Sequence, residues 1–173
     1  MRDKSGPSGH ERTFGTEEII VSKTDLSGRI TYANDVFVRI SGYTEAELLG
    51  RAHSIIRHPD MPRCVFELLW KTIQGGEEIF AYVVNMAKNG DHYWVFAHVT
   101  PTFGPDGAII GYHSNRRTPD ASAVDKVRPL YAALVAEEQK AASKAEAVAR
   151  SSRVVEELLR SKNVRYDEFV FSL

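Results

Sequence analysis

The sequence has little cysteine and no long hydrophobic run. One thiol, that of Cys64, cannot form an internal disulfide or a cysteine-rich zinc site. No apolar segment approaches the roughly 18 residues that a membrane-spanning helix requires. The first six residues are polar and lack the apolar core of a signal peptide. We therefore expect a cytoplasmic protein with no membrane span.

The charge is also nearly balanced, with 22 Lys and Arg against 23 Asp and Glu. Nucleic-acid-binding domains usually carry a basic excess, so we expect no nucleic-acid partner. The sequence contains no G-x-S-x-G and no P-loop, and its six histidines form no metal-ligand motif such as H-E-x-x-H. We accordingly expect no catalytic residues, no metal site and no enzymatic activity.

A length of 173 residues suits one well-packed domain with a tail. Residues 1–18 are rich in glycine, serine and charge, and we expect a flexible or helical arm there. Residues 19–118 carry the strand and helix patterns of the main domain. Within the C-terminal segment, residues 119–173, residues 122 to about 162 are rich in Ala, Glu, Lys and Arg, which favours a long helix.

Within the main domain, two strand patterns precede the helices and three follow them. Asn34 and Thr44 each have the position and residue type of a helix N-cap, and Glu47 completes a capping box with Thr44. Asn89-Gly90 is a strong hairpin signal between two strand patterns. The expected strands cover residues 19–21, 30–33, 79–86, 92–103 and 109–115, and the longest helix expected within this domain runs from Met61 or Pro62 to about Gln74. This order predicts an α+β fold, a five-stranded antiparallel sheet with short helices over one face.

The C-terminal segment, residues 119–173, leaves its packing open. Pro129 predicts a kink or a restart of the helix. The apolar residues recur at roughly helical spacing, so the segment can pair two chains as a coiled coil or fold back as a helical hairpin. We expect a homodimer-forming helix. The last eight residues are apolar for a free terminus and are expected to dock on the domain or on a partner.

One short polar stretch, Ile56-Arg57-His58-Pro59-Asp60-Met61-Pro62, lies between apolar segments. Its two prolines restrict the backbone beside a cation, an imidazole and a carboxylate. A stiff polar corner of this kind can present fixed hydrogen bonds to a mostly apolar pocket, although a solvated turn is an equal reading.

Three other residues have two possible roles. Asn85 ends an apolar strand run, so it requires a partner if it faces inward. Asn34 serves a helix cap or a site. Trp70 lies on an apolar helix stripe and belongs to the core or stacks on a planar ring.

Several motifs together resemble the PAS domain signature. They are Gly28-Arg29-Ile30-Thr31-Tyr32-Ala33-Asn34, Ser41-Gly42-Tyr43, and Lys88-Asn89-Gly90-Asp91-His92-Tyr93-Trp94-Val95. With Arg57 to Pro62 added, the pattern resembles the PAS domain of bacterial aerotaxis transducers, which sense redox state through non-covalent FAD. The resemblance covers residues 19 to about 118.

This resemblance implies a sensor that binds FAD and signals through its C-terminal helix to a separate protein, a chemotaxis or other signalling partner. The implied flavin-site residues are Asn34, Arg57, His58, Asp60, Trp70, Asn85 and Tyr93. The alternatives are a haem-binding gas sensor, a cofactor-free PAS interaction module, and an enzyme that uses bound flavin. A flavin-cysteine photoreceptor is disfavoured, since Ala52-His53 occupies the place of its reactive cysteine.

Overall fold

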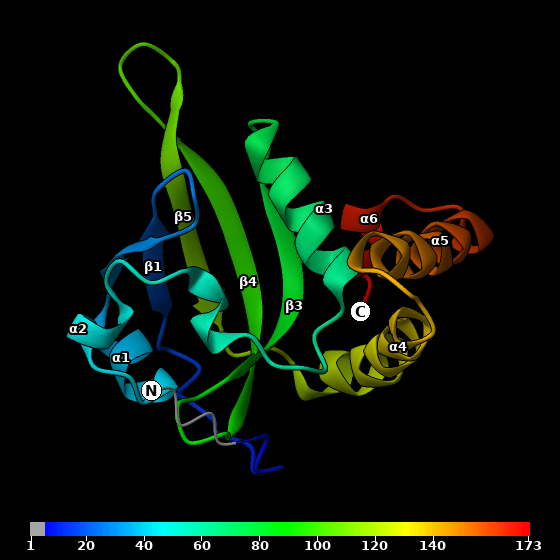
Figure 1. The fold of residues 1–173 in the computed structure, drawn as a ribbon, viewed down its shortest axis with the longest axis horizontal. Helices are drawn as coiled ribbons and strands as arrows, with labels where there is room; N and C mark the ends of the chain where they lie inside the picture. The colour runs from blue at the N-terminus through cyan, green and yellow to red at the C-terminus, as the bar shows by residue number, and fades with distance from the viewer. Residues whose placement is uncertain (1–5) are drawn as a thin grey trace.

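The computed structural model describes residues 6–173, which form one antiparallel sheet with helices packed against it (Figure 1). Five strands make a single sheet in the order β2-β1-β5-β4-β3, with every neighbouring pair antiparallel. The expected α+β fold is confirmed. In chain order the elements are β1 (Ile20–Thr24), β2 (Ile30–Ala33), α1 (Asp35–Ser41), α2 (Glu45–Leu48), the 3-10 helix η1 (His53–Ile56), α3 (Arg63–Gln74), β3 (Ile79–Met86), β4 (His92–Phe103), β5 (Ile109–Arg117), α4 (Ala121–Gln139), α5 (Lys144–Lys162) and α6 (Tyr166–Phe171).

Local signals fix the helix starts in the first half. The Asn34 side chain accepts a hydrogen bond from the Phe37 N–H and so caps α1. Thr44 and Glu47 make the expected capping box at α2. Gly42 ends α1 with a φ of 70°, a left-handed conformation that glycine adopts without a Cβ penalty.

Strand alternation divides the sheet into two faces. Register pairs such as Val83 with Val95 place odd-numbered residues of β3 and β4 on the inner face, toward η1 and α3. Even-numbered residues form the outer face, which is rich in aromatic rings. Phe80 and Phe96 stack there with ring centroids 5.7 Å apart, and Trp94 is also buried. Both faces therefore require a cover.

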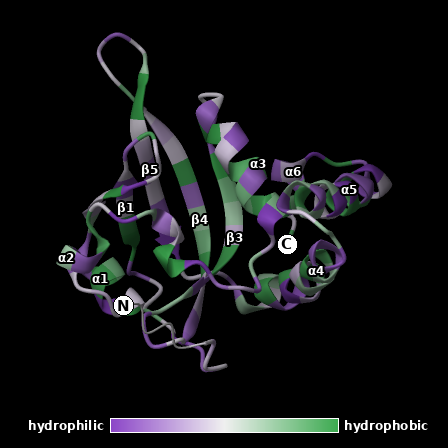
Figure 2. Ribbon diagram, in the orientation of Figure 1, coloured by the Kyte–Doolittle hydropathy of each residue, from purple (hydrophilic) through white to green (hydrophobic). Residues whose placement is uncertain are grey.

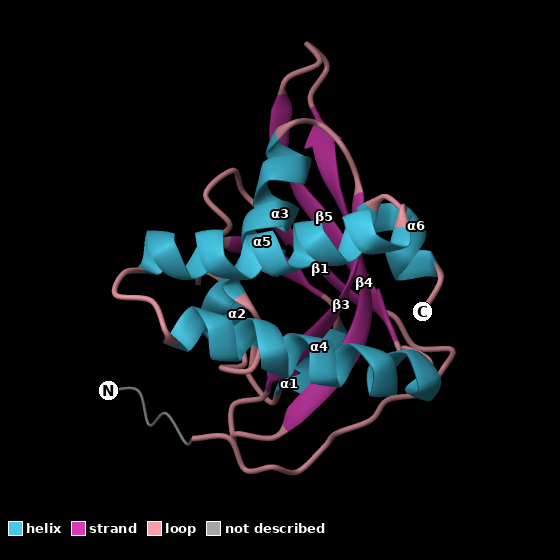
Figure 3. Ribbon diagram, turned by 90° about the vertical axis from the view of Figure 1, so that its right-hand side faces the viewer, coloured by secondary structure: helices cyan, strands magenta, loops and turns pink. Residues whose placement is uncertain are grey.

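The C-terminal segment covers the outer face and the free edge of β3 (Figures 1 and 3). It is helical as expected, but it forms a hairpin of α4 and α5 followed by the short α6 rather than one long helix. The helix does not restart at Pro129, which lies inside α4. The break comes at residues 140–143, where Ser143 caps α5 by accepting from the Glu146 N–H. Figure 2 shows hydrophobic and hydrophilic residues alternating along both helices, the pattern of amphipathic elements.

Two tyrosines donate hydrogen bonds to backbone carbonyl groups of β3, at the edge of the sheet. The Tyr131 hydroxyl of α4 donates to the Tyr82 carbonyl at 2.5 Å, and the Tyr166 hydroxyl of α6 donates to the Phe80 carbonyl at 3.0 Å. Burial raises the pKa of both hydroxyls, which keeps them as donors. Phe171 of α6 packs on Phe80 with centroids 4.8 Å apart. The last residues thus dock on the domain, one of the two expected arrangements.

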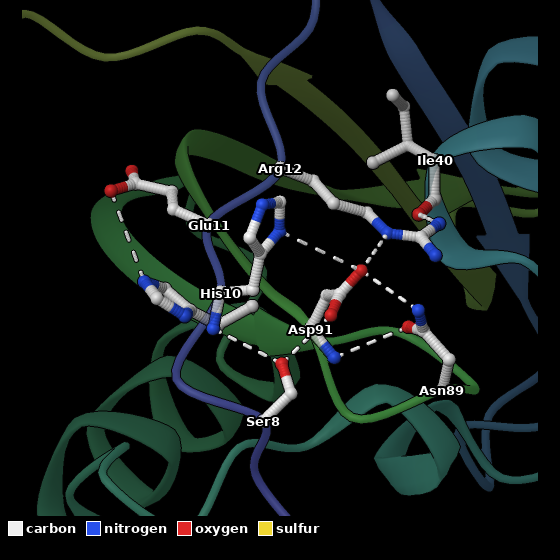
Figure 4. A network of polar contacts seen from close by, with 8 residues as sticks. Ser8, His10, Glu11, Arg12, Ile40, Asn89 and Asp91 are labelled. Carbon is white, nitrogen blue, oxygen red and sulfur yellow. Dashed lines mark hydrogen bonds and ion pairs between the residues drawn. The ribbon is translucent and has the colours of Figure 1, made fainter.

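The N-terminal arm lies along the β3–β4 hairpin (Figure 4). The arm expected over residues 1–18 includes residues 1–5, which lie outside the described part; residues 6–18 contain no helix. Asp91 joins the arm to the hairpin, accepting from Ser8 at 2.7 Å and from Arg12 Nε at 2.9 Å. These bonds, with the one from Asn89, hold the pKa of Asp91 well below its usual range. Arg12 also donates to the Ile40 carbonyl.

Candidate functional site

A cavity of about 410 Å³ lies between the inner face of the sheet, η1 and α3. This volume falls within the range usual for small-molecule sites. Strands β1, β3, β4 and β5 form its floor, and Lys144 and Val148 of α5 reach its wall from the far end of the chain. Sequence segments that are more than a hundred residues apart therefore meet around one space.

Three of the sequence-predicted residues, Arg57, Trp70 and Asn85, line this cavity. Arg57 follows η1, and its backbone forms an isolated antiparallel bridge with Asn85 of β3, which ties the polar corner to the sheet. The Arg57 guanidinium lies over the Phe66 ring at 4.4 Å. Burial, together with the nearby Arg63, lowers the pKa of Arg57.

Trp70 lies where α3 meets the turn before β2. Its ring meets Tyr112 edge-on, with centroids 5.5 Å apart at 87°. The backbone of Gly28 packs closely on the Trp70 ring, since a Cβ at that position would lie 2.9 Å from the indole. Trp70 thus presents a positioned planar wall to the cavity.

The other four predicted residues do not line the cavity. Asn34 caps α1 and also bonds β1, accepting from the Val21 N–H and donating to the Ile19 carbonyl. His58 is buried, and its Nδ1 accepts from the Asp60 N–H at 3.1 Å, while the Asp60 side chain is exposed. Tyr93 is fully buried on the inner face.

Arg116 of β5 is a site residue that the sequence did not single out. It is 2% exposed and lines the cavity. It donates to the Ser22 hydroxyl at 2.5 Å, and its guanidinium lies over the Phe37 ring at 4.4 Å. Burial lowers its pKa to about 10, so it remains a cation at neutral pH. No carboxylate among residues 6–173 forms an ion pair with it.

His53 also lines the cavity, although it is not among the implied flavin-site residues. Its Nε2 lies 3.1 Å from the Ser22 hydroxyl, and its ring stacks on Phe37. Burial, and secondarily the positive charge of Arg116, lowers the pKa of His53 to about 3. The imidazole is therefore neutral in the folded protein at neutral pH.

The cavity holds buried donors that lack acceptors. Asn85 Nδ2, Arg116 Nε and Arg116 Nη1 have no hydrogen-bond partner within the described chain. Leaving such a donor unsatisfied costs about 1–3 kcal/mol, and an unpaired buried charge costs more. A planar ligand in this cavity with acceptor atoms along one edge can accept hydrogen bonds from such donors.

A family model described as the PAS fold matches residues 30–116. The chain belongs to the PAS fold family. The match runs from the start of β2 almost to the end of β5, so it contains the walls of the cavity except those from β1, the turn before β2 and α5.

Relatives of this PAS domain include signalling proteins. It is 47% identical over 115 residues to the aerotaxis receptor of Escherichia coli (strain K12), covering 66% of this chain and 22% of that receptor. It is 30% identical over 99 residues to the nitrogen fixation regulatory protein of Klebsiella pneumoniae, covering 57% of this chain and 20% of that protein. The expected resemblance to aerotaxis transducers is confirmed. The chain spans about a fifth of the length of these relatives.

Solved structures support the same fold. A light-oxygen-voltage domain, from work on a flavin analogue, aligns with a TM-score of 0.59 at 20% identity, covering 65% of this chain and 85% of that one. In residues 6–173, no helix is long and apolar enough to cross a membrane. The same part of the chain holds no cluster of three metal-ligating side chains.

Proposed function

We propose that this PAS domain binds FAD non-covalently in the 410 Å³ cavity and acts as a redox or oxygen-linked sensor. The observation that carries the proposal is the set of unsatisfied donors on Asn85 and Arg116 in a cavity that Trp70 also lines. The relationship to an aerotaxis receptor and the fold shared with a light-oxygen-voltage domain studied with a flavin analogue support a flavin over other planar ligands.

Three cavity-lining residues each offer the ring a different kind of contact. Asn85 carries both a donor and an acceptor, so its amide can match a ring edge that presents both kinds of group. Arg116 supplies a fixed positive charge in a buried setting, where its field is weakly screened. Trp70 offers a planar face. Behind these residues, Asn34, His58, Asp60 and Tyr93 are proposed to hold the walls in position.

A bound flavin supplies reversible electron and proton uptake. Asn85 and Arg116 would hold the ring edge, and the contacts they prefer would depend on the charge and the hydrogen-bonding groups that this edge carries. The fixed charge of Arg116 favours the more negative form and therefore raises the reduction potential. Rearrangement at Asn85 passes to Arg57 through their backbone bridge.

We propose that the signal leaves through the C-terminal helices, which pack on both α3 and the sheet. The receiver is a separate chemotaxis or other signalling protein, and the sensor is a cytoplasmic homodimer without enzymatic activity of its own. Light scattering at several protein concentrations tests the dimer, since a mass that stays at 19.4 kDa contradicts it.

The absorption spectrum of the purified chain tests the cofactor. After incubation with FAD and removal of free flavin, we expect the bands of an oxidised flavin and their bleaching on chemical reduction. A Soret band would instead indicate haem, for which the neutral His53 offers an axial nitrogen in the cavity. A protein that stays colourless after incubation with FAD would support the cofactor-free interaction module.

A further inference from the structure

The helical hairpin of α4 and α5 forms part of the cavity. Lys144 is the first residue of α5, and Val148 lies one turn later on the same side of the helix. Both line the cavity together with Arg57, which follows η1, and Arg63, the first residue of α3. The PAS family match ends at residue 116, so these two contributions come from outside the matched region.

The charges around this opening are mainly positive. Arg57, Arg63, Lys144 and the deeper Arg116 line the cavity, against one lining carboxylate, that of Glu67. Glu67 is already paired with Lys71 at 3.4 Å. Neither Arg63 nor Lys144 makes an ion pair with any residue from 6 to 173. Both side chains are exposed, so they are available to an anion at the opening.

A partly buried set of hydrogen bonds holds the hairpin in this place. Pro62, at the N-cap of α3, makes no side-chain capping bond, so the first N–H groups of α3 need another acceptor. Glu138 of α4 supplies it. Its Oε1 accepts from the Arg63 N–H at 2.7 Å and from the Cys64 N–H at 3.2 Å. Ser151 of α5 donates to the same oxygen at 2.8 Å. One carboxylate therefore joins α3, α4 and α5 beside the opening.

We propose that the C-terminal hairpin is a wall of the cofactor site, where Lys144 with Arg63 binds the phosphate groups of a flavin nucleotide and so links cofactor binding to hairpin docking. This inference rests on the proposed flavin function. The ring is held at depth by Asn85 and Arg116, and the phosphates lie at the opening. Lys144 therefore determines selectivity for a phosphorylated flavin over riboflavin, which has the same ring without phosphate.

Linkage makes the effect reciprocal. A ligand that contacts both α3 and α5 binds only the docked hairpin with full affinity, and it stabilises docking by the same factor. The hairpin thus carries information about the cavity without any contact between the ring and the outer face of the sheet.

The test compares dissociation constants of FAD and riboflavin, measured by flavin fluorescence on the full chain. Lys144→Ala is expected to weaken FAD about tenfold, the effect of losing one charge-assisted contact, and to change riboflavin less than about twofold. Lys140→Ala is the matched control, because Lys140 lies in the same connection, pairs with Glu137 and does not line the cavity. It should leave both constants unchanged.

Equal losses for FAD and riboflavin, or no loss for either, would overturn the role of Lys144 while leaving flavin binding intact. Failure of the unaltered chain to bind either flavin would overturn the proposed function itself and this inference with it. Hydrogen exchange in α5 is a second measurement of the link between FAD binding and hairpin docking. FAD is expected to slow exchange in α5 in the unaltered chain and to slow it less in Lys144→Ala; exchange in α5 that FAD does not affect would refute the linkage.

Discussion

Glu138→Ala is expected to lower the free energy of unfolding by about 2 kcal/mol. The substitution removes the acceptor for two N–H groups at the start of α3. Loss of a helix N-cap costs about 0.5–2 kcal/mol, and the upper end applies because Cys64 is only 4% exposed and its N–H is poorly placed to find water. Ser151 adds little to the loss, since its single O–H can donate instead to the Ala147 carbonyl, 3.0 Å away.

The assay is urea unfolding followed by tryptophan fluorescence and by circular dichroism. Glu138→Gln keeps the acceptor oxygen without the charge and should lose about half as much, since charged acceptors bond roughly twice as strongly as neutral ones. Glu137→Ala is the positional control: its partners, Lys140 and Arg150, both lie within the hairpin region, so a smaller loss is expected. A loss below about 0.5 kcal/mol for Glu138→Ala would refute the capping argument.

Three further outcomes follow from single contacts. Tyr131→Phe should cost about 1–3 kcal/mol in urea unfolding, because the buried Tyr82 carbonyl loses its donor; an unchanged midpoint would contradict the edge-capping role. His53 has a folded pKa of about 3, below its ordinary 6.5, so the stability it contributes is present above pH 6.5 and is lost as pH falls toward 3. Unfolding free energies measured across that range should fall by up to about 1.4 kcal/mol per pH unit, and His53→Gln should flatten this part of the profile. An equally steep profile in the variant would argue against His53 as the source. Gly28→Ala adds a Cβ 2.9 Å from Trp70 at a φ of 78°, so it should shift the indole and its fluorescence spectrum; an unchanged spectrum would contradict the close packing.

Local chemistry was sufficient to predict most of the sheet and the first helices. Asn34 caps α1, and Thr44 with Glu47 caps α2, because these bonds form within three residues. Strand β3 covers the same residues, 79–86, as the pattern predicted. Signals carried by neighbouring residues do not depend on how distant segments meet.

The missed features depend on distant segments. The last strand was expected to end at Asn115, and β5 continues to Arg117, so Arg116 was left outside the predicted sheet. Arg116 faces the inner side of the sheet because β5 pairs with β1 in a fixed register. No local sequence pattern specifies that pairing. The one available signal was the alternation of β5 itself, continued two residues further.

The choice between a coiled coil and a hairpin has the same origin. The apolar spacing of residues 119–173 fits both arrangements. Within one chain, the hairpin is favoured by hydrogen bonds to the edge carbonyls of β3 and to the N–H groups at the start of α3. The sequence gives no sign that these groups lack other partners. Whether two chains also pair through the remaining surface is still a prediction.

The dissociation constant of FAD for the unaltered chain and for Asn85→Ala tests the central claim most directly, that unsatisfied donors in the cavity hold a flavin. Asn115→Ala is a suitable control, because strand alternation places Asn115 on the opposite face of β5 from Arg116. The account predicts saturable FAD binding that Asn85→Ala weakens at least about tenfold while Asn115→Ala leaves it unchanged. Equal constants for the unaltered chain and Asn85→Ala, in proteins with the same circular dichroism spectrum, would contradict it.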